Sequence, residues 1–470
     1  MLTTVEPLRP LQSTLRTRLL SVVLLAATLG LSPAAENESA GPTLEKFHPK
    51  KAPKPPGLVL REGDRLAICG DSITEQKMYS RIMETYLTVS VPELDVTTRQ
   101  YGWGGETASG FLARMTNDVL RFKPTIATTC YGMNDHQYRP YEKSIGDTYR
   151  AKSSAIVRSF KENGVRVIHG SPGCVGKRPG WSKDTNSTLD ALNLNLCELR
   201  NIGVEIAESE STGFADVFWP MLTASYAAQE RYGTNYAVAG SDGVHPGWSG
   251  HLIMAYAFLK SFGLDGEIGT FTVDMKSHEA EASKGHEIVS FKEDELKIKS
   301  SKYPFCAAGD RASDKSIRSG MTLVPFNKEL NRLMLVVKNG KAENYKIIWG
   351  ETAKIYSAEQ LGRGINLAED FEINPFSDPF ARVDKAVIAK QTYETKQIKQ
   401  IFHELGAGKW KSADAIKDEE MRELYEKLNR DGKLDMDALA AETEKKRAPL
   451  AAAIKTAFVP VTHTLRIEAQ

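Results

Sequence analysis

The chain has 470 residues, of which 41% are hydrophobic and 26% are charged, and 61 Lys and Arg are balanced by 60 Asp and Glu. These fractions are typical of a globular protein and exclude a disordered or collagen-like chain. The net charge of +1 provides no basic field, so we expect neither a nucleic-acid partner nor attraction to an anionic membrane.

Residues 1–34 have the pattern of a secretory signal peptide. An arginine-containing start precedes an apolar run over residues 19–31, and residues 32–34 match the expected cleavage positions. The run is shorter than the roughly 20 residues that a membrane-spanning helix needs. A buried N-terminal helix is the alternative, but no amphipathic pattern accompanies the run. We therefore expect export to the periplasm or the medium and no membrane span, with a Pro/Lys-rich linker over residues 35–62.

Over residues 63–265, short apolar runs alternate with helical periods. Apolar residues at helical spacing predict helices near residues 108–119 and 189–199 and a last helix over 248–262. Strands that alternate with helices indicate a parallel sheet covered on both faces, the doubly wound α/β class. The predicted strands of this domain are residues 66–69, 95–98, 125–130, 165–169 and 215–218.

Two further regions follow this domain. Residues 266–378 contain predicted strands without helices between them, which predicts a small antiparallel β-rich accessory domain. Residues 379–470 are rich in Lys, Glu, Ala and Gln at helical spacing, and this helical region ends in a strand-like segment over residues 461–467. The strands predicted in the accessory domain are residues 270–273, 287–291, 333–337 and 345–349.

The five cysteines are too few for a disulfide scaffold, and their odd number leaves at least one free thiol. Cys69 and Cys130 lie in apolar strand-like runs and are expected to be small buried residues. The Asp-rich segment 429–437 has a weak likeness to a calcium loop. Its first and twelfth ligand positions would be Lys427 and Ala438, which lack carboxylates, so we favour a break between two helices at Gly432.

Four short polar segments follow predicted strands of the α/β domain. They are Gly-Asp-Ser-Ile-Thr at 70–74, Gly-Trp-Gly-Gly-Glu-Thr at 102–107, Gly-Met-Asn-Asp at 132–135 and Asp-Gly-Val-His-Pro at 242–246. In an open parallel sheet, ligands bind outside the carboxyl ends of the strands. We therefore expect the four segments to meet at one rim.

Each segment also has a structural explanation. Ser72 and Glu75 fit a capping box, the glycines permit a tight turn, and Asn134 is a common turn residue. Together, however, the segments supply every part of an acyl-transfer site. Ser72 is the candidate nucleophile, and His245 is its candidate base, oriented by Asp242 three residues earlier. The candidate oxyanion donors are the N–H of Ser72, the N–H of Gly105 and the side-chain amide of Asn134.

The ordered set of four segments resembles the four sequence blocks of the SGNH (GDSL) hydrolases over about residues 66–262. The resemblance implies a flavodoxin-like three-layer α/β/α domain and hydrolysis of esters or thioesters without a metal or other cofactor. It also implies roles for Ser72, Gly105, Asn134 and His245 as catalytic Ser, oxyanion Gly, oxyanion Asn and catalytic His. Ile73 replaces the family's Leu, a conservative change.

These patterns predict an exported serine esterase that acts on short acyl esters, acetyl above all, of a carbohydrate or another polar alcohol. The partner is then a small-molecule or polysaccharide ester. A lipase or acyl-thioesterase, an acyltransferase with the same site, and a non-catalytic glycan-binding protein remain alternatives. His251 is expected to be structural. Candidate substrate contacts are Trp103, His136, Tyr138 and Trp248, and further residues able to bond hydroxyls are Glu106, Asn117 and Asp135.

Overall fold

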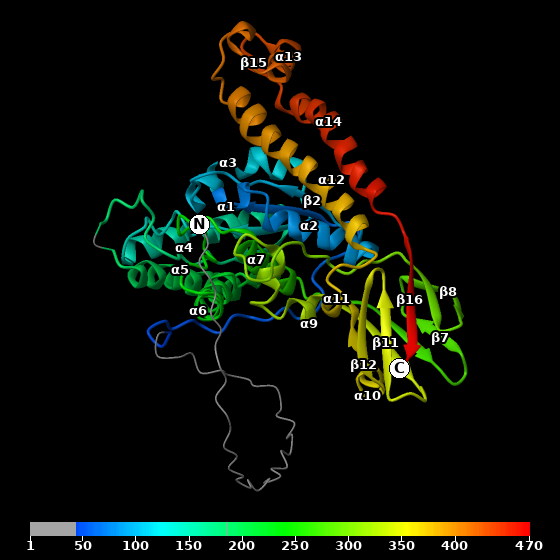
Figure 1. The fold of residues 1–470 in the computed structure, drawn as a ribbon. Helices are drawn as coiled ribbons and strands as arrows, with labels where there is room; N and C mark the ends of the chain where they lie inside the picture. Colours follow the sequence, from blue (N-terminus) through cyan, green and yellow to red (C-terminus); the bar gives the residue numbers. More distant parts are fainter. Residues whose placement is uncertain (1–43, 186) are drawn as a thin grey trace, which may run out of the picture. The chain divides into compact units, whose positions relative to one another are not determined.

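The computed structural model describes residues 44–185 and 187–470 (Figure 1). The predicted signal peptide lies outside the described residues. Phe47–Gln470 forms one compact unit, and the description below concerns this unit. Over the described ranges, no helix is long and apolar enough to cross a membrane.

The first part of the unit contains a five-stranded parallel sheet in the order β2-β1-β3-β4-β5. This order is that of flavodoxin-like folds. The buried runs of the sequence form the strands, although the predicted strand 215–218 is shifted, because β5 ends at Ala215 and a helix begins at Phe218. The strands are β1 (Arg65–Gly70), β2 (Thr97–Gln100), β3 (Ile126–Cys130), β4 (Arg166–Gly170) and β5 (Gly213–Ala215).

Helices cover both faces of this sheet. Apolar side chains of α3, α4 and α5 share one hydrophobic core with alternate residues of β1, β3 and β4. Helices α2 and α7 pack against each other and cover the opposite face. The three-layer α/β/α prediction is therefore confirmed. The helices are α1 (Ser72–Glu75), α2 (Tyr79–Ser90), α3 (Ala108–Asp118), α4 (Lys143–Glu162), α5 (Leu189–Ser209), α6 (Phe218–Tyr232) and α7 (Trp248–Ser261).

The β-rich region contains two sheets, in the orders β13-β10-β6-β7 and β12-β11-β16-β9-β8. The antiparallel prediction is wrong for one pair, because β6 and β10 run parallel and are joined by a long crossover through β7–β9. The strands are β6 (Glu267–Asp274), β7 (Glu279–Ala282), β8 (His286–Lys292), β9 (Glu295–Ser300), β10 (Arg332–Lys338), β11 (Asn344–Trp349), β12 (Thr352–Ser357), β13 (Ile365–Asn366) and β16 (Val461–Ala469).

From about residue 377 the chain leaves the β-rich region as a series of helices, and its C-terminal segment returns to that region (Figure 1). The last strand, β16, inserts between β11 and β9, so the predicted C-terminal strand is part of the β-rich region. We call residues 377–457 the helical excursion. It contains α12 (Ser377–Thr395), the π-helix η3 (Lys396–Leu405), α13 (Glu419–Leu428) and α14 (Met436–Ala457). Between α13 and α14, the calcium-like segment forms the hairpin β14–β15 (Asn429–Arg430 and Lys433–Leu434).

Short elements complete the chain: η1 (Pro92–Leu94), η2 (Leu120–Phe122), α8 (Ile317–Met321), α9 (Phe326–Leu330), α10 (Ala358–Arg363), α11 (Leu367–Asp370) and η4 (Ala413–Ala415). All five cysteines are free. Cys69 and Cys130 are buried in β1 and β3 as predicted, and burial raises the pKa of both thiols. Among the described residues, no group of three or more His, Cys, Asp or Glu side chains is placed to hold a metal ion.

Candidate active site

Ser72 is the first residue of α1, directly after β1. Asp71 accepts the Ile73 N–H at 3.0 Å and thereby caps the helix. The capping-box interpretation, in which Ser72 itself caps α1, is therefore wrong. The Ser72 hydroxyl instead lies 2.8 Å from His245 Nε2.

Asp242 and His245 lie in the loop before α7. The Asp242 Oδ2 atom is 2.7 Å from His245 Nδ1, and Oδ1 accepts the N–H groups of Val244 and His245 at 2.8 and 2.9 Å. Partial burial would raise the pKa of Asp242, but these hydrogen bonds outweigh burial and hold the pKa below its usual value. The carboxylate is therefore charged at neutral pH and accepts the proton on Nδ1. This arrangement leaves Nε2 free to accept the Ser72 proton.

The loop between β2 and α3 brings Gly105 to the same rim. Gly105 has φ +72°, a backbone conformation that other residues rarely adopt. The Trp103 N–H donates to the Gly70 carbonyl at 3.0 Å, which joins this loop to the end of β1. Asn134 Nδ2 donates to the Glu106 carbonyl at 3.0 Å, and the Tyr138 hydroxyl donates to Asn134 Oδ1 at 3.0 Å. These bonds fix the orientation of the Asn134 amide beside the Gly105 turn.

Several predicted hydroxyl-binding residues are used within the protein. Glu106 makes a bidentate ion pair with Arg114 at 2.6 Å and is buried. Asp135 accepts the N–H groups of Ala108 and Gly132 at 3.0 Å each. Burial raises the pKa of Asp135 to about 6. These side chains hold the loops of the site together and are not available to a substrate hydroxyl.

Two further predicted contacts are also occupied. The Asn117 side-chain amide donates to Asp118 Oδ1 at 2.9 Å, and its oxygen accepts from the Arg121 guanidinium of η2 at 2.8 Å. His136 is fully buried, its Nδ1 bonds the Met133 carbonyl, and burial lowers its pKa to about 4. The Tyr138 ring lies 4.6 Å from the His136 ring.

The aromatic candidates have different surroundings. Tyr138 is half-buried and holds Asn134, in a strained left-handed conformation with φ +54°. Trp103 is half-buried and lies 4.9 Å from the Arg114 guanidinium. Trp248 is half-buried beneath the Arg81 guanidinium, 5.4 Å from its ring centre. Both tryptophans therefore pack on protein cations.

His251 has the structural place that we expected. It is fully buried on α7, accepts the Tyr79 N–H at Nδ1 and bonds Gln76 Oε1 at 2.8 Å. Burial, with the neighbouring His245, lowers its pKa to about 3. His251 is therefore neutral at pH 7, and its bond with the Tyr79 N–H supports the start of α2.

Sequence reasoning missed Trp181, in the loop between β4 and α5. Its side chain is 48% exposed, and its ring lies 5.9 Å from the His245 ring and 5.8 Å from the Tyr138 ring. A lone tryptophan in a polar loop after a predicted strand was the available signal, but no motif contains it. An exposed aromatic face beside the candidate base can bind the apolar face of a substrate ring.

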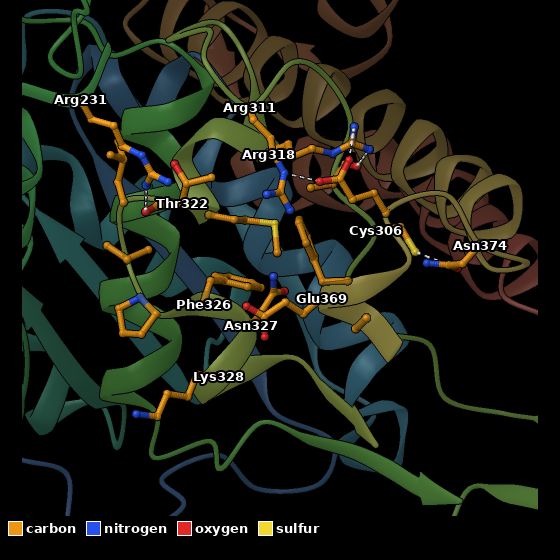
Figure 2. A pocket seen from close by; sticks show the side chains of 18 residues that line it. Arg231, Cys306, Arg311, Arg318, Thr322, Phe326, Asn327, Lys328, Glu369 and Asn374 are labelled. Carbon is orange, nitrogen blue, oxygen red and sulfur yellow. Dashed lines mark hydrogen bonds and ion pairs between the residues drawn. The ribbon is translucent and has the colours of Figure 1, made fainter. Parts of the chain in front are cut away.

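A separate cavity lies away from this rim. It has a volume of about 530 Å³ and is lined by residues from segments 305–328 and 368–374, with Arg231 from α6. Figure 2 shows Arg311 and Arg318 among these residues. Both arginines make ion pairs with Glu372. None of the four motif segments contributes to the cavity, so it is not the acyl-transfer site.

The chain is similar to proteins of known family and structure. Residues 68–253, which include all four motif segments, match the GDSL-like lipase/acylhydrolase family. An acetylxylan esterase of Geobacillus stearothermophilus is 26% identical over 232 residues, which cover 44% of this chain and 98% of that enzyme. The solved structure of a gut microbial diltiazem-metabolizing enzyme shares the fold, with a TM-score of 0.68 and 21% identity, over 89% of this chain and 100% of that one.

The serine–histidine–aspartate contacts and the family match lead to the same conclusion for the α/β domain. Residues 68–253 form a domain of the SGNH (GDSL) hydrolase family, and the chain is a serine hydrolase that acts on ester bonds.

Proposed function

We propose that the protein removes short acyl groups, acetyl above all, from a carbohydrate or a similar polar alcohol through an acyl-enzyme on Ser72. The observation that carries the assignment of residues is the chain of contacts from Ser72 through His245 to Asp242, at 2.8 and 2.7 Å. The pattern of residues 1–34 further supports export of the enzyme.

In the first half-reaction, Ser72 Oγ attacks the ester carbonyl carbon and transfers its proton to His245 Nε2. The carbonyl oxygen becomes an oxyanion, which accepts hydrogen bonds from the N–H of Ser72, the N–H of Gly105 and Asn134 Nδ2. Asn134 Nδ2 carries two hydrogens, of which one is bound to the Glu106 carbonyl, so the second remains for the oxyanion.

The oxyanion then collapses, the ester C–O bond breaks, and His245 returns its proton to the departing alcohol. In the second half-reaction, water attacks the acyl-enzyme, and His245 accepts a proton from the water and returns it to Ser72 Oγ. The products are the free alcohol and the carboxylic acid, and the enzyme is regenerated. Asp242 stabilises the imidazolium in both halves through the proton on Nδ1.

Two observations favour a sugar alcohol. The 26% identical relative acts, by its name, on acetylated xylan. In this chain, Trp181 exposes an aromatic face 5.9 Å from the His245 ring, where the alcohol side of an ester would leave. An aromatic ring with one face open to solvent can stack on the apolar face of a sugar ring, while the sugar hydroxyls stay in contact with water.

The test of the substrate class uses a series of p-nitrophenyl esters from acetate to laurate, followed by acetylated xylo-oligosaccharides. We expect kcat/KM to fall steeply beyond butyrate and acetate to be released from the oligosaccharides. Ser72→Ala, with an unchanged melting temperature, is the matched control. A kcat/KM that rises through C8 and C12 would instead identify a lipase, because each buried CH₂ contributes about 0.8 kcal/mol.

A further inference from the structure

The helical excursion reaches the loop that carries Gly105. Its π-helix η3 places the His403 ring 4.7 Å from the Trp103 ring and the Lys399 ammonium 5.3 Å from the same ring. Lys399 Nζ also bonds Glu75 Oε1 at 2.6 Å. Glu75 is the last residue of α1, three residues after Ser72 and therefore one helical turn away from it.

The Gly105 loop packs directly on α1. A Cβ atom at Gly102 would overlap the backbone nitrogen of Glu75, and a Cβ atom at Gly104 would lie 3.0 Å from Glu75 Oε2. One carboxylate oxygen of Glu75 therefore faces Lys399 while the other faces the Gly104–Gly105 turn. A displacement of this carboxylate would be transmitted to the turn.

Buried ion pairs and hydrogen bonds attach the excursion, whose helix η3 carries Lys399, to the hydrolase domain. Lys390 on α12 is 1% exposed and bonds Glu84 on α2 at 3.0 Å and Glu394 at 2.8 Å. Arg447 on α14 bonds the same Glu394 at 2.7 Å. Lys390 and Arg447 also donate to the Thr98 carbonyl of the edge strand β2, at 2.7 and 2.9 Å. Removing one partner of such a buried network is strongly destabilising, so the excursion is a fixed part of the hydrolase domain.

We propose that Lys399 is a positioning residue of the acyl-transfer site. By holding Glu75 and Trp103, it keeps the Gly104–Gly105 turn where the Gly105 N–H donates to the oxyanion. This inference rests on the proposed function of Ser72 and Gly105. It assigns a catalytic purpose to a region, residues 377–457, that lies outside the segment matching the GDSL-like family.

The test compares Lys399→Met with Lys396→Met. Lys396 lies one turn away on η3, and its ion pairs among the described residues are with Asp418 at 2.9 Å and Glu420 at 3.0 Å, both within the excursion. Lys399→Met should lower kcat on p-nitrophenyl acetate by at least about tenfold, because an error of about 1 Å in a catalytic group reduces rates up to about 10²-fold. KM should change less than about threefold, and Lys399→Arg should restore most of kcat.

The ion pairs of both lysines are partly exposed, so we expect melting temperatures within about 2 °C of the wild type for all variants. Glu75→Gln should lower kcat in the same way and provides a second test if Lys399→Met does not fold. A kcat for Lys399→Met within twofold of Lys396→Met would overturn the inference. A rise in KM alone would overturn it too, since it would make Lys399 a substrate contact.

Failure of the proposed function is distinguishable from failure of this inference. A fluorophosphonate probe should label Ser72 in the wild type and in every lysine variant. Absence of labelling in the wild type would reject the acyl-transfer site itself, and the inference with it. Normal labelling and turnover in the wild type, with an unaffected Lys399→Met, would reject only the positioning role.

Discussion

Replacing Asp242 by Asn should disable the base while leaving the fold intact. The Asn side chain can place its oxygen where Asp242 Oδ1 accepts the N–H groups of Val244 and His245, at 2.8 and 2.9 Å. Its NH₂ group then faces His245 Nδ1, which must accept a hydrogen bond. The imidazole proton consequently moves to Nε2, and Nε2 can no longer take the proton of Ser72.

The size of the effect follows from the same contacts. Turning the Asn amide over would restore the productive tautomer, but it would lose two hydrogen bonds to backbone N–H groups, about 1 kcal/mol each. That penalty alone reduces the productive population roughly 30-fold. Loss of the negative charge that stabilises the imidazolium adds to it, so we expect kcat to fall by about 10²–10⁴-fold.

The assay is kcat on p-nitrophenyl acetate, with the melting temperature measured alongside. Asp314→Asn is the matched control, because Asp314 also accepts a backbone N–H, that of Ala237, at 3.3 Å, and lies outside the four motif segments. Its kcat should stay within about twofold of the wild type. A kcat for Asp242→Asn within tenfold of the wild type would refute the argument from tautomers.

Three further predictions concern the oxyanion, the sugar and acid stability. Asn134→Ala should lower kcat about 10²–10³-fold with little change in KM, and a loss below threefold would exclude Asn134 as a donor. Trp181→Ala should raise KM for acetylated xylo-oligosaccharides about tenfold but leave p-nitrophenyl acetate within twofold; equal effects on both substrates would contradict sugar binding. Burial lowers the pKa of His463 to about 3, with its Nδ1 accepting from Trp349 at 3.1 Å. Its contribution to stability is therefore present above about pH 6.5 and lost as the pH falls towards 3, about 2 kcal/mol by pH 5. His463→Gln should reduce the loss of unfolding free energy between pH 7 and pH 5 by that amount, measured in urea, and an unchanged loss would refute it.

The α/β domain was predictable because its signals are local. The run from Leu66 to Cys69 is buried on both faces, as central parallel strands are, and each polar motif directly follows such a run. The carboxyl ends of parallel strands meet at one edge, so the motifs alone predicted which side chains would be neighbours. Element boundaries were predicted less accurately, since the strand predicted over residues 215–218 is observed as β5 at Gly213–Ala215.

The arrangement of the C-terminal half could not be predicted in the same way. Nothing in the sequence of β16 specifies that it pairs with β9 and β11. Its residues alternate between buried and exposed, and a strand with this pattern can pair with many other half-buried strands. Parallel pairing of β6 with β10 depends on a long crossover rather than on a local turn. These pairings are decided by packing between segments far apart in the chain.

The residues of the site likewise fall into those that local motifs predict and those that only the folded structure brings together. Ser72, His245 and Asp242 lie in motifs whose chemistry can be recognised from a few adjacent residues. Trp181 belongs to no motif, and Lys399 meets Glu75 across 324 residues of sequence. The hydroxyl-binding roles expected of Glu106 and its neighbours failed because local sequence does not show that a polar side chain is already paired.

The central claim is that Ser72 forms the acyl-enzyme. Its most direct measurement is to label the folded protein with a fluorophosphonate, digest it and locate the adduct by mass spectrometry. We expect one adduct, on Ser72, with p-nitrophenyl acetate hydrolysis lost in proportion to labelling. In Ser72→Ala we expect neither labelling nor hydrolysis. An adduct on another residue, or full esterase activity in folded Ser72→Ala, would contradict it.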